Sequence, residues 1–335
     1  MQESFSGDGL ILAKFGPLPK DWKTPTLSYN RYSESLFRNP LYDLASTSRS
    51  NSAPLPAVIM PSMLASTIRT ESSKCLTVQG GLLVITDDCA LGHAGDRILL
   101  PFDKVMFPLV MANCGWASQT LTFLEQHIDK TQSYTVLDVG ANVGLFTRQL
   151  AIRFKNLTRF ICVEADPENF RVLEYNVASL LSQRGALYNV ALSNSEGHAR
   201  FFRNSENLGN YSLNGDAMRD RPFNTVVVKS VETDLWMLEN VRMQPHDRLI
   251  WKSDTQGYDE LIISMTPISI WNRISCAIVE LWRIKKPDFD KAAFRHRIDC
   301  FPNKSIGLDN PSTTEDVMAF LSGEDWHHDD LFLWR

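Results

Sequence analysis

Short apolar runs alternate with amphipathic segments over the last two thirds of the chain. Four of these runs have the length of buried strands, namely residues 135–139, 159–163, 249–253 and 276–281, and a weaker fifth run covers 187–192. After each of the first two runs, apolar residues recur every three or four positions, which predicts two helices. The alternation predicts a doubly wound α/β sheet with helices on both faces, of the Rossmann-like kind.

The segments before this sheet have a different character. Residues 1–72 are rich in Ser, Pro, Asn and Thr, which is typical of an arm or linker. Residues 73–130 combine a hairpin signal around Gly80 and Gly81 with near-helical apolar spacing from Phe102 to Asp129. We therefore predict an N-terminal extension with a small β element and lead-in helices, followed by a main domain at 131–335.

Two later segments complete this prediction. Residues 197–233 hold β-prone pieces around a polar loop rich in Asn and Gly, an insertion expected to cover the mouth of the sheet. After Phe301, a helix at about 314–321 lies between two short β-prone runs, 305–308 and 331–334, that would supply the last strands.

The strongest chemical signal is the run Val-Leu-Asp-Val-Gly-Ala-Asn-Val-Gly at 136–144, a strand entering a glycine turn that opens a helix. Such a turn lets a ligand approach backbone N–H groups at the helix start. A dinucleotide site would need glycine in place of Asn142, and Asp138 would repel a pyrophosphate. S-adenosylmethionine instead carries a sulfonium and an ammonium, which Asp138 would attract.

A second acid stands at the matching place on the next strand. Glu164 follows Gly140 by 24 residues, where a carboxylate accepts both ribose hydroxyls of a nucleoside cofactor. The predicted cofactor-binding residues are Asp138, Gly140, Ala141, Asn142, Gly144, Phe146, Glu164, Ala165 and Asp166. The alternative is that the glycines only make a tight turn and the acids cap helices; Asp166, just before Pro167, fits an N-cap.

A later motif, Lys-Ser-Asp-Thr-Gln-Gly-Tyr-Asp at 252–259, accompanies the first. Together the two motifs resemble the FkbM family of methyltransferases, whose pattern is D-x-G-A-N-x-G, a strand-end acid and a later K-x-D-x-x-G-x-E. Asp259 stands where the family has Glu. The resemblance covers about 100–335 and implies a class I methyltransferase sheet. It also implies O-methyl transfer from S-adenosylmethionine to a hydroxyl on a saccharide, glycan or natural-product scaffold.

Methyl transfer to a weakly acidic hydroxyl requires alignment of the acceptor and removal of its proton. Asp254 ends the 249–253 strand at the edge where open α/β sheets bind ligands, so we predict that it is the base or orients the acceptor. Lys252 would tune that carboxylate or be solvated, and Glu280 is a second candidate. Alternatively, Asp254 pairs with Lys252 or caps the next helix, and Glu280 caps a helix or pairs with Arg283.

Neither the histidines nor the cysteines form a recognisable metal or redox motif. His-His-Asp-Asp at 327–330 resembles a metal cluster, but adjacent residues cannot all face one ion, so we predict a solvated loop and no metal. The six cysteines include no C-x-x-C pair. Cys162 and Cys276 lie in apolar runs, which is typical of buried thiols in a reducing compartment.

The overall charge and the chain start narrow the function further. The formal net charge is −5, and no Lys and Arg run is interleaved with aromatics, which disfavours a nucleic-acid partner. No basic leader and no apolar stretch of about 20 residues is present, so we predict a cytoplasmic protein without a membrane span. The expected partner is a small-molecule or glycan acceptor. A nicotinamide-dependent oxidoreductase and a non-catalytic cofactor-binding module remain alternatives, and the oligomeric state is open.

Overall fold

The computed structural model describes residues 75–79, 82–244, 246–323 and 325–335. The predicted arm at 1–72 lies outside these residues.

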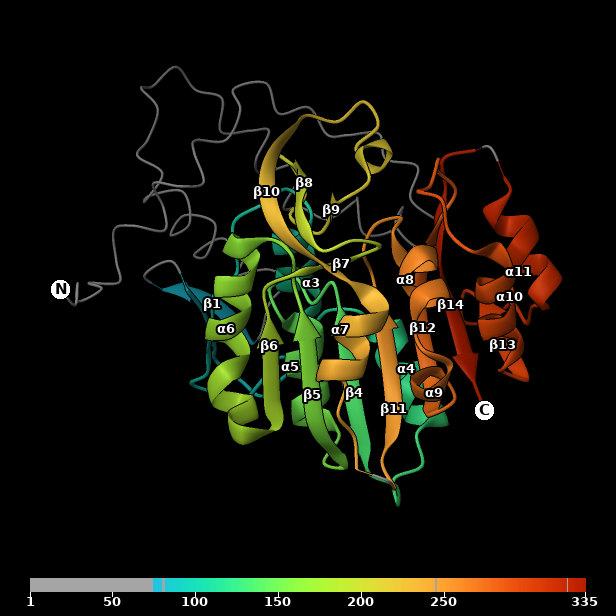
Figure 1. Cartoon of the computed structure of the whole chain (residues 1–335). Coiled ribbons are helices and arrows are strands. Elements are labelled where there is room, and N and C mark those ends of the chain that lie inside the picture. Colours follow the sequence, from blue (N-terminus) through green and yellow to red (C-terminus); the bar gives the residue numbers. More distant parts are fainter. Residues whose placement is uncertain (1–74, 80–81, 245, 324) are drawn as a thin grey trace.

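A seven-stranded sheet forms the centre of the molecule, in the order β13-β14-β12-β11-β4-β5-β6 (Figure 1). Five strands are parallel: β4 (Tyr134–Val139), β5 (Leu157–Val163), β6 (Gly185–Tyr188), β11 (Arg248–Ser253) and β12 (Ile274–Trp282). Antiparallel β14 (His328–Trp334) lies between β12 and β13 (Asn303–Ile306). The strand order reverses beside β4, which places a ligand crevice at the carboxyl ends of β4, β5 and β11.

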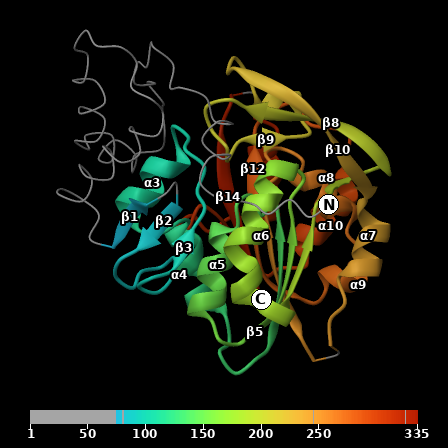
Figure 2. The same cartoon turned by 90° about the vertical axis from the view of Figure 1, so that its left-hand side faces the viewer.

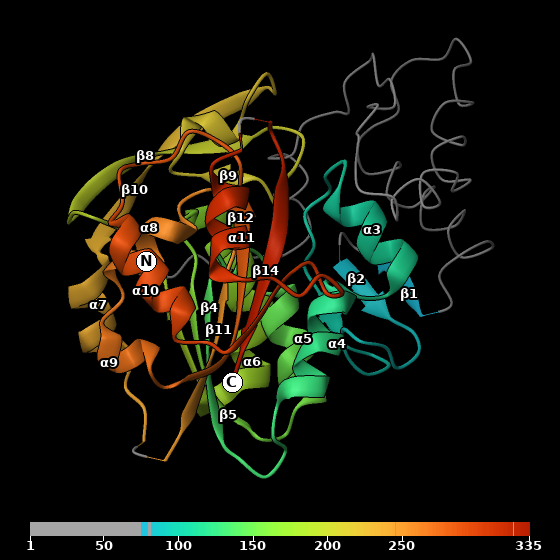
Figure 3. The ribbon, with the colours of Figure 1, turned by 90° about the vertical axis from the view of Figure 1, so that its right-hand side faces the viewer.

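Helices cover both faces of this sheet, as the two edge-on views show (Figures 2 and 3). One face packs on α4 (Ser118–His127), α5 (Leu145–Arg153) and α6 (Pro167–Leu181). The other face packs on α7 (Thr233–Asn240), α8 (Asp259–Met265), α9 (Ile268–Trp271), α10 (Lys291–Asp299) and α11 (Thr314–Leu321). In β4, Val136 faces the first layer while Leu137 and Val139 face the second, so both faces of the strand are apolar. The predicted α/β sheet of the Rossmann-like kind, with helices on both faces, is confirmed.

A second, four-stranded sheet lies over the carboxyl ends of the parallel strands (Figure 1). Its order is β7 (Ala191–Ser193), β10 (Phe223–Glu232), β8 (Gly197–Asn204) and β9 (Tyr211–Ser212), and the one-turn helix η2 (Gly215–Ala217) follows β9. The single strand predicted at 187–192 is therefore wrong. After η1 (Ser182–Arg184) and β6, the chain leaves the main sheet at Tyr188 and pairs with β10 instead. Val190 and Leu192 still reach the main core, which explains why the apolar pattern hid the break.

The accessory element consists of β1 (Leu76–Gln79), β2 (Leu82–Ile85), β3 (Arg97–Ile98) and α3 (Met106–Asn113). It packs on the start of α5 and on α6 through Val143, Leu145 and Val172. The buried Asn176 side chain exchanges two hydrogen bonds with the backbone of Leu99, both at 2.8 Å. These contacts attach the accessory element beside the glycine turn.

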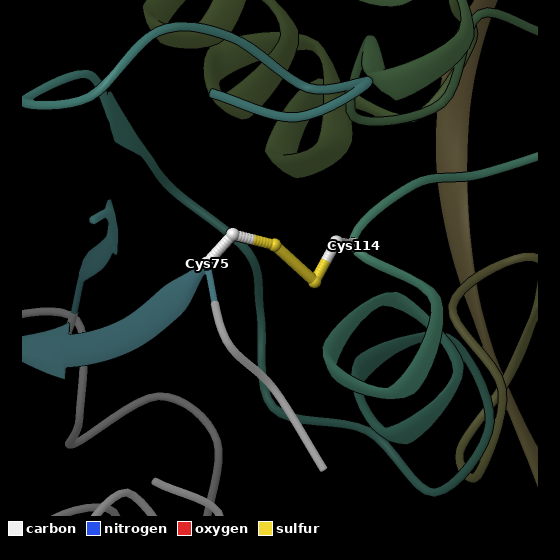
Figure 4. Close-up of a disulfide and its surroundings, with 2 residues drawn as sticks. All are labelled: Cys75 and Cys114. Atoms are coloured by element: carbon white, nitrogen blue, oxygen red, sulfur yellow. A yellow bond between two sulfur atoms is a disulfide. The ribbon is translucent and has the colours of Figure 1, made fainter. Parts of the chain in front are cut away.

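Two cysteines of this region are joined (Figure 4). Cys75, just before β1, forms a disulfide with Cys114 at the end of α3. Cys162 and Cys276 are buried free thiols, as predicted. Disulfides are typical of oxidising compartments, so this pair departs from the expectation of an all-thiol protein. Within the described residues, no helix is long and apolar enough to cross a bilayer.

Candidate active site

A cavity opens where β4, β5 and β11 end, beneath the second sheet. Eight of the residues predicted from sequence line it, namely Gly140, Ala141, Asn142, Phe146, Glu164, Ala165, Lys252 and Asp254. The accessory element adds Met106, the connection from α3 to α4 adds Trp116, and the insertion adds Leu208, Gly209, Tyr211 and Leu213. The insertion thus covers the mouth of the sheet, as predicted. Its lining residues carried no sequence signal, because only the chain path brings them to the cavity.

The glycine turn at 140–144 packs closely against the ends of β5 and β11. Gly140 has a φ of +73°, and a Cβ there would lie 2.0 Å from the carbonyl oxygen of Asp254. The N–H groups of Gly140 and Ala141 both donate to the Val163 carbonyl, at 2.9 and 3.0 Å. These two N–H groups are therefore used within the protein, and the close backbone approach at Gly140 is to the end of β11.

Asp138 is fully buried beneath the turn rather than facing the cavity. One of its oxygens accepts a 2.6 Å hydrogen bond from the Thr147 hydroxyl, and the other lies 3.2 Å from Lys252 Nζ. Lys252 Nζ also donates to the Gly140 carbonyl at 2.9 Å. Burial alone would lower the pKa of Lys252, but Asp138 and Asp254 raise it well above its usual value. Lys252 thus connects β11 to the glycine turn through a hydrogen bond, and its charge neutralises that of Asp138.

Glu164 lines the cavity at the end of β5 and is only 5% exposed. Its two oxygens accept the N–H groups of Asn142 and Asp166, each at 2.8 Å. Burial raises the pKa of Glu164 to about 8, although both hydrogen bonds oppose the rise. Each oxygen of a carboxylate has room for a further donor. The side chain is therefore oriented to accept a pair of hydroxyls.

Asp166 has a structural task. Its Oδ1 accepts the N–H groups of Glu168 and Asn169 at 2.9 and 3.0 Å, capping α6. Its Oδ2 pairs with Arg203 of β8. The capping alternative is confirmed for Asp166, which does not line the cavity. Gly144 likewise stands outside the lining, where a Cβ would lie 2.7 Å from Leu173 of α6.

Asn142, in the glycine turn, contacts the loop between β8 and β9 that lines the cavity from above. This residue has a φ of +50°, a left-handed conformation that Asn tolerates better than most residues. Its Nδ2 donates to the Leu208 carbonyl at 3.3 Å, while its buried Oδ1 has no hydrogen-bond partner among the described residues. From the other side, Asp103 Oδ2 accepts the Leu208 N–H at 3.0 Å.

The predicted catalytic carboxylates Asp254 and Glu280 are brought together by one shared hydrogen-bond donor. The Gln256 amide nitrogen donates to Asp254 Oδ1 at 2.6 Å and to Glu280 Oε2 at 2.5 Å. Lys252 Nζ lies 3.9 Å from Asp254 Oδ2. Arg283 pairs with Asp325, so the alternative of a Glu280–Arg283 pair is wrong. Asp254 does not cap α8 either, whose start has no side-chain cap.

Asp259 and the segment 327–330 lie close to these carboxylates. Asp259 is buried and accepts the Thr255 N–H at 3.1 Å, which closes the turn after β11. The solvated loop predicted at 327–330 is wrong for three of its four residues, because 328–330 belong to β14, and Asp330 stands opposite Glu280. Within the described residues, no group of three or more His, Cys, Asp or Glu side chains is arranged to hold a metal.

Comparison with known proteins gives matches among solved structures only. No protein-family model and no curated protein sequence matches this chain. The methyltransferase FkbM from Methylobacillus flagellatus is 12% identical with a TM-score of 0.38, and the match covers 68% of this chain and 52% of that one. An rRNA methylase from Streptococcus thermophilus is 11% identical with a TM-score of 0.33, covering 64% and 93%.

A precorrin-6y C5,15-methyltransferase from Geobacter metallireducens is also similar, at 10% identity and a TM-score of 0.29, covering 65% of this chain and 87% of that one. This chain thus spans about half of the FkbM methyltransferase and most of the other two. The chemistry of the site is argued from the residues of this chain alone.

Proposed function

We propose that this chain binds S-adenosylmethionine in the cavity and transfers its methyl group to a hydroxyl of a saccharide, glycan or natural-product scaffold. Glu164 would accept the ribose hydroxyls, and the apolar walls at Ala165, Val190 and Leu192 would hold the adenine. The unpartnered Oδ1 of Asn142 would accept an N–H of the cofactor. These residues fit the ribose and adenine of that cofactor, which need hydroxyl acceptors and an apolar slot.

The observation that carries this proposal is the charge of the cavity lining. Among the described residues, Lys252 is the single cationic residue of this lining, and Asp138 already neutralises it. The N–H groups of Gly140, Ala141 and Asn142 all have acceptors within the protein. A pyrophosphate would be repelled by the carboxylates of Glu164 and Asp254, whereas a sulfonium would be attracted. This arrangement disfavours a nicotinamide dinucleotide.

The chain's own residues would act on the acceptor. S-adenosylmethionine, when bound, supplies a methyl group on a positively charged sulfur. Asp254 lines the cavity with a side chain that is 38% exposed, so it would orient the acceptor hydroxyl and take its proton. Lys252 holds the turn and the Asp254 strand end together, and residues of the insertion line the cavity beside them.

Calorimetric titration with S-adenosylhomocysteine tests the cofactor. A hydrogen bond to a charged group contributes about 1.5–3 kcal/mol. Glu164→Ala removes two such bonds, so the Kd should rise at least about 100-fold. Glu168→Ala, which removes an acid at the exposed start of α6, is the matched control and should leave the Kd unchanged. Thermal stabilisation by NAD but not by S-adenosylhomocysteine would contradict the proposal.

Acceptor identity needs a separate assay. Wild-type protein with S-adenosylmethionine labelled in its methyl group would be incubated with a panel of mono- and oligosaccharides and hydroxylated polyketides. Label in an ether-linked methyl of one acceptor is the expected result. Tight cofactor binding without transfer to any member would favour the non-catalytic module.

A further inference from the structure

A row of polar side chains leads away from Asp254 across β12 and β14. In this antiparallel pair, Glu280 stands opposite Asp330 and Trp282 stands opposite His328. Side chains alternate between the two faces of a strand, so these four project from the same face. Asp254 directly follows β11, the neighbour of β12, and lies at the near end of this row.

Hydrogen bonds, an ion pair and a ring contact link the members of the row in sequence. Glu280 Oε2 accepts from Gln256 Nε2 at 2.5 Å and from Trp282 Nε1 at 2.6 Å. Glu280 Oε1 lies 3.2 Å from His328 Nδ1. The His328 ring stacks on Trp282, with centroids 4.6 Å apart and planes inclined by 14°. Both rings are thereby fixed against Glu280.

Gln256 holds the near end of the row. Its backbone has a φ of +56°, a left-handed conformation that costs free energy for a residue with a side chain. The Ser212 hydroxyl, from β9, donates to its carbonyl at 2.8 Å and secures this conformation. The result is one amide aimed at both Asp254 and Glu280.

The two carboxyl groups are also close to each other, because the same Gln256 amide nitrogen contacts both. Burial, and then the neighbouring Asp254, raise the pKa of Glu280 well above its usual value. A negative charge on Asp254 disfavours a second one on Glu280, so Glu280 takes up a proton more readily in this position.

We propose that Asp254 and Glu280 act as one carboxyl pair that accepts the proton of the acceptor hydroxyl, and that His328 passes this proton on to solvent. The inference rests on the proposed methyl transfer. Gln256 and Trp282 are positioning residues, because they touch the pair and not the acceptor. The His328 side chain is 29% exposed, which opens the far end of the row to water.

The acceptor O–H bond breaks as an oxygen–methyl bond forms, and the sulfur–methyl bond breaks with its electron pair left on sulfur. The released proton binds to the carboxyl pair. Glu280 then gives a proton to His328 Nδ1, and His328 loses one from its other nitrogen to water. Burial lowers the pKa of His328, so the ring is neutral and able to accept at neutral pH.

Several charged groups surround this row and would contribute to its titration. They are Lys252 of β11, Asp259 at the start of α8, Asp329 and Asp330 of β14, His327 just before β14, and Arg221 of the loop after η2. None of these groups is substituted in the NMR titration that tests the relay.

Nitrogen NMR of protein carrying ¹⁵N-labelled histidine measures the coupling without any acceptor. His328→Gln identifies the His328 signal by its loss. In the wild type we expect two inflections over the pH titration, one from the ring and one from the carboxyl pair. Asp254→Asn removes a negative charge and should lower the His328 midpoint by about half a pH unit or more. Asp325→Asn, at the exposed partner of Arg283, should leave it unchanged.

Gln256→Gly keeps the left-handed backbone and deletes the bridging amide, so the second inflection should weaken or vanish. Glu280→Gln should leave a single inflection. A His328 titration that is identical in the wild type, Asp254→Asn and Gln256→Gly would overturn the inference. Binding of S-adenosylhomocysteine to the wild type is measured alongside. Its absence with intact coupling would contradict the proposed cofactor alone, and its presence without coupling would contradict the relay alone.

Discussion

At the scale of single residues, the ion pair between Lys252 and Asp138 holds the glycine turn in place. Asp138 is fully buried, and Lys252 is its only cationic partner among the described residues. A buried ion pair adds little net stability, but removal of one partner leaves an uncompensated charge. The pair therefore fixes the geometry of the turn more than it stabilises the fold.

Lys252→Met should accordingly lower the free energy of unfolding by about 3–5 kcal/mol, because Asp138 is left buried and charged. Urea unfolding followed by circular dichroism measures the change. The double variant Lys252→Met with Asp138→Asn should recover much of the loss. A single variant as stable as the wild type would contradict the structural role of this ion pair.

At the scale of elements, the accessory element, the main sheet and the second sheet each contribute one wall of the cavity. The loop between β8 and β9 is held from the accessory side by Asp103 and by a 2.5 Å pair between Lys104 and Glu206. From the main sheet, Asn142 holds the same loop. Two sets of contacts therefore hold the loop that covers the cavity. We call them clamps: the first comes from Asp103 and Lys104, and the second from Asn142.

Asp103→Asn tests the first clamp. Asp103 Oδ1 accepts from Phe107 and Oδ2 from Leu208, so an amide keeps one acceptor and presents a donor to the other N–H. We expect weaker S-adenosylhomocysteine binding, by about 3–10-fold, and faster hydrogen exchange at Leu208 with little change at β4. Equal exchange in both proteins would show that the clamp is not needed.

The disulfide between Cys75 and Cys114 is testable by counting thiols. Freshly purified protein unfolded in urea without reductant should take up iodoacetamide at four of its six cysteines, and at all six with reductant. Mass spectrometry of the intact chain distinguishes the two. Six labels without reductant would mean that the pair stays reduced, in keeping with the predicted cytoplasmic location.

At the scale of the whole molecule, buried acids gather around the cavity and beyond it. Burial raises the pKa of Glu164 to about 8, of Asp259 and Asp330 to about 7, and of Asp103 to about 6. Each value lies above that of the unfolded chain, so the folded state binds more protons over this interval. The molecule as a whole tolerates these groups best when they are neutral.

The free energy of unfolding should therefore fall as the pH rises from about 5 to about 8, and urea titrations at several pH values measure it. Bound S-adenosylmethionine, with its positive charge and hydroxyl donors, would favour the ionised form of Glu164 and flatten this decline. Stability that rises through the same window would show that these acids titrate normally.

Much of this molecule followed from local pattern. Buried parallel strands need apolar runs, and an acid at a strand end needs only the strand to be found, so β4, β5, β11, β12 and the positions of Glu164 and Asp254 were predictable. The cap at Asp166 was also local, since it depends on Pro167 and the first turn of α6.

Tertiary structure decided the partners. Which strand pairs with Ala191–Ser193, which carbonyl meets Gly140, and which cation neutralises Asp138 all depend on contacts between residues distant in sequence. His328 became a neighbour of Glu280 only because β14 pairs antiparallel with β12 in one register. A sequence specifies the period of its own side chains, whereas register and charge pairing are fixed when separate elements bury their surfaces against one another.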